Sequence, residues 1–180
     1  MSAEYRVKGS TIRSKLDFAA ERLGAAARRA LEARLEAAGV TQILDADWYP
    51  FRFYDGVLRS LAADQFGGNL SQLREVGVYS AEKALSTTYA AYAAQRDFPS
   101  FLERLSALHR RFYSTGRLEV TAKGDDFCEL DLVELPEVSY ADVYIAAGFY
   151  IGAAKLMGLE RARCRFQVGD DGVHFRLDWS

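Results

Sequence analysis

Two kinds of apolar spacing in the last third of the chain restrict the fold more than any other feature. After Gly116, apolar and polar residues alternate over 118–133 around a turn at 123–126, and they alternate again over 161–179 around a turn at 169–172. Such alternation predicts two half-buried β-hairpins. The segment between them, 139–157, is apolar on every side in its middle, which predicts a long buried helix. The predicted order is therefore strand, strand, helix, strand, strand.

The solvent faces of the two hairpins carry opposite charge. Counting outward from each turn gives the expected cross-strand pairs. They are Val168–Val173, Arg165–Arg176 and Arg163–Asp178 in the second hairpin, and Glu119–Asp131 and Thr121–Glu129 in the first. Like charges directly opposite each other are destabilising. We therefore expect the acidic and the basic hairpin to lie side by side, so that each supplies the other's counter-charges.

The first 115 residues are mainly helical in pattern. A short strand over 4–8 precedes helical spacing over 10–23, 25–38, 51–66, 71–95 and 97–112. The fold class is α+β: an N-terminal helical lobe packed on a C-terminal four-stranded antiparallel sheet of two hairpins joined by a long buried helix. We expect one domain over 1–180, with the helical lobe at 1–115 and the sheet-plus-helix lobe at 116–180.

Composition excludes several functional classes. The 180 residues carry a net charge of −2, which argues against a nucleic-acid binder. The uncharged run 143–154 has only 12 residues, fewer than the roughly 20 that cross a membrane, so no membrane insertion is expected. The N-terminus lacks the apolar stretch of a secretion signal, and two cysteines make no disulfide framework. The expected location is the cytoplasm.

No catalytic or metal-binding constellation stands out. Only two histidines are present, His109 and His174, and no Gly-x-Ser-x-Gly motif accompanies them. His174 is expected on the solvent face of the last strand, and His109 at a partly buried helix end, with haem or metal ligation as its alternative role. Cys128 and Cys164 are expected to be core thiols rather than metal ligands. We therefore expect no enzyme and no metal.

The arginines of the second hairpin admit two interpretations. Arg161, Arg163, Arg165 and Arg176 pair with the acidic hairpin, or they bind an anion or an acidic partner. The first is the plainer expectation.

The buried helix contains a Gly-x-x-x-Gly spacing, at Gly148 and Gly152. Glycines four residues apart allow close backbone approach by another element. Packing on the chain's own sheet is one explanation, and a surface for a ligand or partner is the other. The residues expected to line such a ligand pocket are Trp48, Phe53, Tyr144, Gly148, Phe149 and Gly152.

Four motifs together resemble a known family. They are Tyr5–Gly9, Trp48–Phe51, Gly148–Gly152 and Phe175–Trp179. The chain resembles an uncharacterised family of myxobacterial proteins, which in turn looks related to 4-vinyl-reductase-type ligand-binding domains, to haem–nitric-oxide-binding domains and to small subunits of the TRAPP tethering complex. The resemblance implies helices packed on an antiparallel sheet. It also implies a module that binds haem, a small ligand or only protein.

Two departures from the cofactor-binding branches bear on haem and metal. The haem-binding branch carries Tyr-x-Ser-x-Arg, whereas the nearest segment here, Phe112–Arg117, has different spacing. His109, the candidate haem ligand, precedes that segment, although the family's histidine lies on a helix further upstream. The vinyl-reductase-type branch has a cysteine cluster where only Cys164 stands here. We therefore expect no cofactor, with haem as the alternative.

The functional expectation is a non-enzymatic cytoplasmic signalling or scaffolding module. It would act through a hydrophobic pocket or a protein–protein interface, with a protein partner or a small apolar ligand and as a homodimer. The alternative is a haem- or small-ligand-binding sensor domain with His109 as the ligand.

Overall fold

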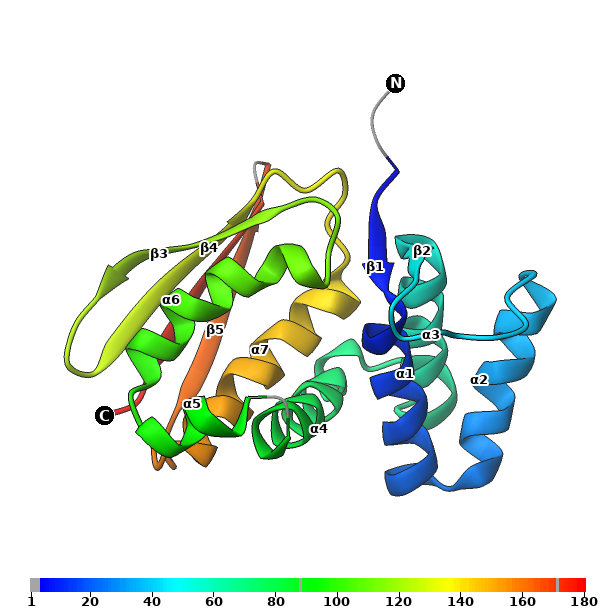
Figure 1. Ribbon diagram of the computed structural model, residues 1–180, viewed down its shortest axis with the longest axis horizontal. Coiled ribbons are helices and arrows are strands. Elements are labelled where there is room, and N and C mark those ends of the chain that lie inside the picture. The colour runs from blue at the N-terminus through cyan, green and yellow to red at the C-terminus, as the bar shows by residue number, and fades with distance from the viewer. Residues whose placement is uncertain (1–3, 88, 171) are drawn as a thin grey trace.

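A computed structural model describes residues 4–87, 89–170 and 172–180. A two-stranded sheet and three helices form the N-terminal group of elements, which stands on one side of the molecule in Figure 1. In chain order this group comprises β1 (Arg6–Lys8), α1 (Gly9–Phe18) with a π-helical turn (Ala19–Leu23), α2 (Ala25–Ala37), β2 (Trp48–Pro50) and α3 (Phe51–Gln65).

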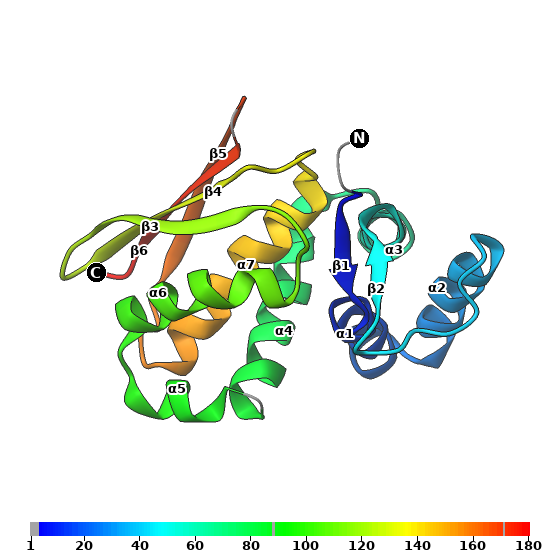
Figure 2. The same cartoon turned by 45° about the horizontal axis from the view of Figure 1, so that its top comes forward.

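The remaining elements form the sheet group, whose four strands have the order β3-β4-β6-β5 and pair in antiparallel fashion. Figure 2 shows α7 and α6 on one face of this sheet, with α4 between α7 and the N-terminal group. The elements are α4 (Leu73–Ser86), α5 (Ala90–Gln95), α6 (Phe98–Leu108), β3 (Arg117–Lys123), β4 (Phe127–Val133), α7 (Tyr140–Leu156), β5 (Arg163–Gly169) and β6 (Gly172–Asp178). The chain is thus α+β with antiparallel sheets, while the lobe boundary at residue 115 stays a prediction.

The strand register confirms most of the expected pairs. Arg165 lies opposite Arg176 in the second hairpin, and Glu119 lies opposite Asp131 in the first. The pair Thr121–Glu129 is wrong, because a β-bulge between Val120 and Ala122 places Ala122 opposite Glu129. A bulge adds one residue to one strand, so a single count cannot hold on both sides of it, and here it fails between the bulge and the turn.

The acidic and basic hairpins lie side by side, as their charges predicted. β4 pairs with β6, so Glu129 faces Arg176 and Asp131 faces His174. The Arg176 guanidinium lies 2.6 Å from Glu129, and His174 Nδ1 lies 2.6 Å from Asp131. These pairs are partly exposed, so each contributes only about 0–1 kcal/mol, and they select the pairing rather than drive folding.

The single helix expected over 71–95 is wrong. α4 ends at Ser86 and α5 begins at Ala90, with Thr88 outside the described residues. The hydroxyls of Ser86 and Thr87 both donate to the carbonyl of Lys83. Side chains that compete for helix carbonyls in this way favour helix ends over helix interiors.

The glycines of α7 face α4 rather than the sheet. An added Cβ on Gly148 would lie 2.7 Å from Cα of Arg74, and one on Gly152 would lie 3.0 Å from Cα of Val78. Gly77 meets α7 in the same way, where its Cβ would lie 2.7 Å from N of Phe149. The two helices therefore approach backbone to backbone, and only glycine allows this separation.

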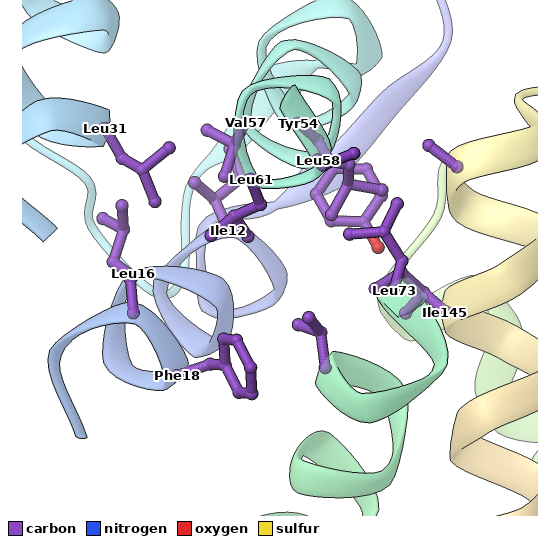
Figure 3. Close-up of a cluster of buried hydrophobic side chains, with 14 of the residues drawn as sticks. Ile12, Leu16, Phe18, Leu31, Tyr54, Val57, Leu58, Leu61, Leu73 and Ile145 are labelled. Atoms are coloured by element: carbon purple, nitrogen blue, oxygen red, sulfur yellow. The ribbon is translucent and has the colours of Figure 1, made fainter. Parts of the chain in front are cut away.

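This close approach brings α4 and α7 into contact with the N-terminal core. Figure 3 shows Leu73 of α4 and Ile145 of α7 next to Tyr54 and Leu58 of α3, in a cluster that also contains apolar side chains of α1 and α2. Tyr54 lies between the two groups and directs its hydroxyl toward Leu73 and Ile145. None of the described helices combines the length and the apolar character that a membrane span requires.

Candidate functional site

The carboxylate of Asp142 is enclosed where the N-terminal group meets the sheet group. Asp142 lies in the first turn of α7, after the N-cap residue Ser139. The hydroxyls of Tyr54 and Tyr113 both donate to Asp142 Oδ1, at 2.9 and 3.1 Å. Burial raises the pKa of Asp142 to about 6, although both phenols and the charge of Lys15 hold it down. The carboxylate is therefore the common acceptor for two phenols from distant parts of the chain.

A buried cation lies near this carboxylate. Lys15 on α1 is 4% exposed, and its ammonium donates to Ser80 Oγ of α4 at 3.0 Å. The ammonium also lies 5.8 Å from the ring centroid of Tyr54. Burial lowers the pKa of Lys15 to about 8, and the charge of Asp142 opposes that shift. Lys15, Tyr54, Ser80, Tyr113 and Asp142 are called the junction cluster below.

Backbone hydrogen bonds hold Tyr113 in the junction. Lys8 N donates to Phe112 O, and Ser114 N donates to Arg6 O, both at 2.9 Å. Residues 112–114 thus extend the β1–β2 sheet, with Val7 and Tyr113 as bridge partners. Any movement of Tyr113 therefore affects both β1 and Asp142.

His109 contacts the junction cluster through a stacked ring. Its imidazole lies parallel to Tyr113, with ring centroids 4.9 Å apart and planes 7° apart. His109 Nε2 is 3.3 Å from the carbonyl oxygen of Thr115, and the pKa of His109 is lowered by burial, with the Thr115 bond opposing this. Gly116, with φ +87°, leaves room beside the imidazole that a side chain would fill. His109 is therefore a neutral imidazole at a partly buried helix end.

Removing one phenol from Asp142 tests the cluster. Tyr113→Phe is expected to lower the free energy of unfolding by about 1–3 kcal/mol at pH 7.5, because a carboxylate loses a donor in a poorly hydrated place. The loss is expected to shrink at pH 5, where Asp142 is largely protonated. Urea denaturation at both pH values measures it.

The matched control is Tyr140→Phe on α7, the helix that carries Asp142. Tyr140 is 51% exposed, so its hydroxyl keeps its water, and the change is expected to stay within about 0.5 kcal/mol. Equal losses for the two variants would contradict the role given to the Tyr113 hydroxyl.

Of the six residues expected to line a pocket, two lie in the N-terminal group and four lie on α7. Trp48 is half-buried under the ammonium of Lys8, and Phe53 lies beneath the guanidinium of Arg52. Tyr144 packs edge-on against Phe166, Phe149 packs edge-on against Tyr150, and Gly148 and Gly152 face α4. Their role as ligand contacts stays a prediction.

Two surface hollows lie elsewhere. One of about 220 Å³ lies among α1, α2 and the segment 40–43, and one of about 540 Å³ lies between α6 and β3. The second is lined by Glu103, Ser106 and residues 119–123. None of the six predicted pocket residues lines either hollow.

The other candidate residues fall as follows. Cys128 and Cys164 are buried core thiols, as expected, and burial raises their pKa values to about 11 and about 12. His174 is partly exposed and pairs with Asp131. In the part of the chain that the structure describes, no three His, Cys, Asp or Glu side chains gather as a metal site.

Sequence reasoning missed the junction cluster, although one signal was present. Ile12, Lys15, Leu16 and Ala19 share one helical stripe, so a lysine stands among residues that face the core. Asp142 opens a helix, where a carboxylate is ordinarily explained by the helix dipole. Only the tertiary structure brings these two charges near each other.

Comparison with known proteins finds similarity in structure and not in sequence. No family model and no curated protein matches the chain. Solved structures do match. An H-NOX protein from S. oneidensis in the Fe(II)NO ligation state has a TM-score of 0.73 at 12% identity, covering 96% of this chain and 99% of that one.

Two further structures agree. An oxygen-binding H-NOX domain related to soluble guanylate cyclases, in its oxygen complex, has a TM-score of 0.69 at 17% identity over 96% of this chain and 95% of that one. A structure used to probe heme distortion in the H-NOX family has a TM-score of 0.72 at 16% identity, with the same coverage.

These matches bear on two expectations, the absence of a cofactor and the resemblance to three kinds of domain. The expectation of no cofactor is wrong in their light, because the matched structures are those of haem domains, including oxygen and Fe(II)NO states. The resemblances to 4-vinyl-reductase-type domains and TRAPP subunits find no support among them. At such low identity the likeness shows the fold alone: this chain has the H-NOX fold, the fold of haem–nitric-oxide-binding domains.

Proposed function

We propose that this chain is a non-enzymatic sensor module that binds haem between its N-terminal group and its sheet group, with His109 as the iron ligand. The carrying observation is the stack of His109 on Tyr113, whose hydroxyl in turn bonds Asp142. A ligand at His109 therefore acts on a side chain that contacts both groups of elements.

The chemistry of the residues around His109 fits a histidine that would hold a haem iron. Burial keeps the imidazole neutral, and a metal needs the neutral form. The side chains of Leu132 and Leu135 lie next to Gly116 and border the imidazole with apolar surface. A haem supplies an iron atom with a position for a small gas molecule, as in the oxygen-bound and NO-ligated structures of this fold.

The packing imposes one condition on this proposal. The ring of Tyr113 covers one face of the imidazole, and Nε2 bonds the Thr115 carbonyl. Ligation through Nε2 requires that nitrogen to leave Thr115, and a planar ligand beside it requires the Tyr113 ring to move. Displacing Tyr113 removes one of the two phenol donors from Asp142, which raises the pKa of Asp142. Ligand binding is thus coupled to the first turn of α7.

Haem titration tests the proposal. The purified full chain is titrated with haem in oxidised and dithionite-reduced form while the Soret band is recorded. We expect saturable binding of one haem per chain, weakened at least tenfold by His109→Ala and unchanged by His174→Ala.

His174→Ala is the matched control because His174 lies on the outer face of the sheet, paired with Asp131. Equal binding by both variants would remove His109 as the ligand. A Soret band that never saturates, as free haem gives with a non-binding protein, would refute haem as the cofactor.

A further inference from the structure

Within the part of the chain that the structure describes, the backbone groups on the outer edge of β5 pair with no other strand. β5 is an edge strand of the sheet, and it pairs with β6 without a register shift from Arg163 to Gly169. Trp179 N donates to Asp126 O, so odd-numbered residues of β6 direct their backbone groups toward β4. Even-numbered residues of β6 therefore form backbone hydrogen bonds with residues 163, 165 and 167 of β5. The backbone groups of Cys164, Phe166 and Val168 point away from β6, to the outer edge of the sheet.

One of these outward groups confirms the assignment. Arg74 of α4 donates from Nη2 to the carbonyl oxygen of Cys164, at 3.3 Å. That carbonyl therefore faces away from β6. Phe166 and Val168 lie two and four residues further along β5. Their backbone N–H and C=O groups point to the same outer edge as the carbonyl of Cys164.

The other edge of the sheet is protected differently. β3 carries the β-bulge near Thr121, and α6 packs against it around the hollow lined by Glu103 and residues 119–123. Bulges and covering elements are common means of blocking strand addition. β5 lacks a bulge, so it is the regular edge of this sheet.

The side chains of β5 and of the segment before it carry positive charge that the carboxylates of the described residues neutralise only in part. Arg165 pairs with Asp178 at 3.0 Å, and Arg176 of β6 pairs with Glu129 and Asp178. Arg161 and Arg163 are both exposed. Among residues 4–87, 89–170 and 172–180, no carboxylate lies within 4.0 Å of either guanidinium. The acidic hairpin therefore neutralises only part of the arginine set.

On the inner side, the same edge presents an apolar surface with a cation beside it. Phe166 and Val168 are half-buried, and the guanidinium of Arg74 lies 5.9 Å from the Phe166 ring centroid and 5.5 Å from that of Tyr144. Arg74 Nε is buried and has no hydrogen-bond partner among the described residues. A strand added here would meet apolar contacts on one face and arginines on the other.

We propose that β5 is a docking edge for an extended acidic segment of a partner protein, in which acidic and apolar residues alternate. The segment would bond the outward backbone groups of Phe166 and Val168 and place its carboxylates beside Arg163 and Arg165. The sheet already contains this arrangement once. β4, with the alternation Glu129-Leu130-Asp131-Leu132, pairs with β6, where Arg176 and His174 face its carboxylates.

Fluorescence anisotropy of a labelled peptide tests the docking edge on the full chain. The probe is the synthetic peptide Glu-Leu-Asp-Leu-Glu-Leu-Asp, and its counterpart carries lysine at every acidic position. We expect saturable binding of the acidic peptide and at least tenfold weaker binding of the lysine peptide. Arg163→Glu is expected to weaken binding of the acidic peptide at least tenfold, because it reverses an exposed charge at the edge.

A second variant separates strand addition from simple charge attraction. Val168→Pro removes an outward N–H without removing a ladder bond to β6, and proline is tolerated on edge strands. It is expected to weaken binding at least tenfold, while Arg29→Glu on α2, an exposed residue far along the chain from β5, leaves it within twofold. Urea denaturation verifies that each variant is folded.

Several results would overturn the proposal. They are absence of saturable peptide binding, equal binding of the two peptides, an unchanged affinity for Arg163→Glu or for Val168→Pro, or an equal loss for Arg29→Glu. Binding of single-stranded DNA as tight as that of the acidic peptide would also overturn it, because the arginines would then be a general anion site.

Discussion

Gly148→Ala is expected to lower the free energy of unfolding by about 3 kcal/mol or more. The new Cβ would lie 2.7 Å from Cα of Arg74 and closer still to its carbonyl oxygen. Both are backbone atoms of α4, so no side-chain rotation relieves the overlap. The helices must separate, and the contacts along α4 and α7 weaken together.

The control is Gly56→Ala on α3. Gly56 also lies inside a helix, but an added Cβ meets nothing within 4 Å. Alanine is the better helix former by about 1 kcal/mol, so this variant is expected to gain stability. Urea denaturation of both variants measures the difference. Equal responses would show that helix propensity, and not the distance between α4 and α7, explains Gly148.

The second large effect is a dependence of stability on pH that arises from Asp142. Its pKa is about 6 in the folded protein, against an ordinary value of 3.8, chiefly because of burial. Between these values the folded state keeps a proton that the unfolded chain has lost. Stability from this group is therefore greatest below about pH 4 and falls as pH rises through 6, by at most about 3 kcal/mol.

Asp142→Asn isolates this contribution. The amide keeps an oxygen for Tyr54 and Tyr113 but has no proton to lose in this range. The free energy of unfolding of the wild type minus that of the variant is expected to fall between pH 4 and 6.5. Carboxylates with lowered pKa, such as Asp97 and Asp178, act in the opposite direction but cancel in this difference. A difference that is flat with pH would contradict the enclosed carboxylate.

Lys15→Met tests how the charge of Lys15 affects the pKa of Asp142. The charge of Lys15 lowers the pKa of Asp142, so without it the pKa rises. The pH at which stability falls is then expected to move upward. An unchanged or a lower pH would contradict the action of Lys15 on Asp142.

Most of the C-terminal architecture follows from local pattern. Alternation in the sequence predicts both hairpins, and the opposite charges of Glu129 and Arg176 predict that the hairpins pair. These features are readable because a strand's two faces repeat every second residue. The bulge at Thr121 and the break after α4 cannot be predicted from this repeat. Each depends on whether local hydrogen bonds replace the regular bonds of the strand or helix.

The candidate site was much less predictable than the fold. The sequence predicts that His109 is a partly buried helix-end histidine, but it predicts neither the stacking of His109 on Tyr113 nor the acceptor role of Asp142. The absence of a matching haem motif led to the expectation of no cofactor, which the fold comparison corrects. A sequence motif can diverge while the fold is retained, because many sequences satisfy the same packing.

The sequence by itself determined the α+β class, the two hairpins, their charge-matched pairing and the buried helix between them, because periodicity and charge are local properties. The tertiary structure alone decided that this helix turns its glycines to α4, and that Lys15, Tyr54, Tyr113 and Asp142 share one enclosed space. Those contacts join residues far apart in the chain. Their energies depend on distance and on exclusion of water, and neither quantity can be read from the order of the residues.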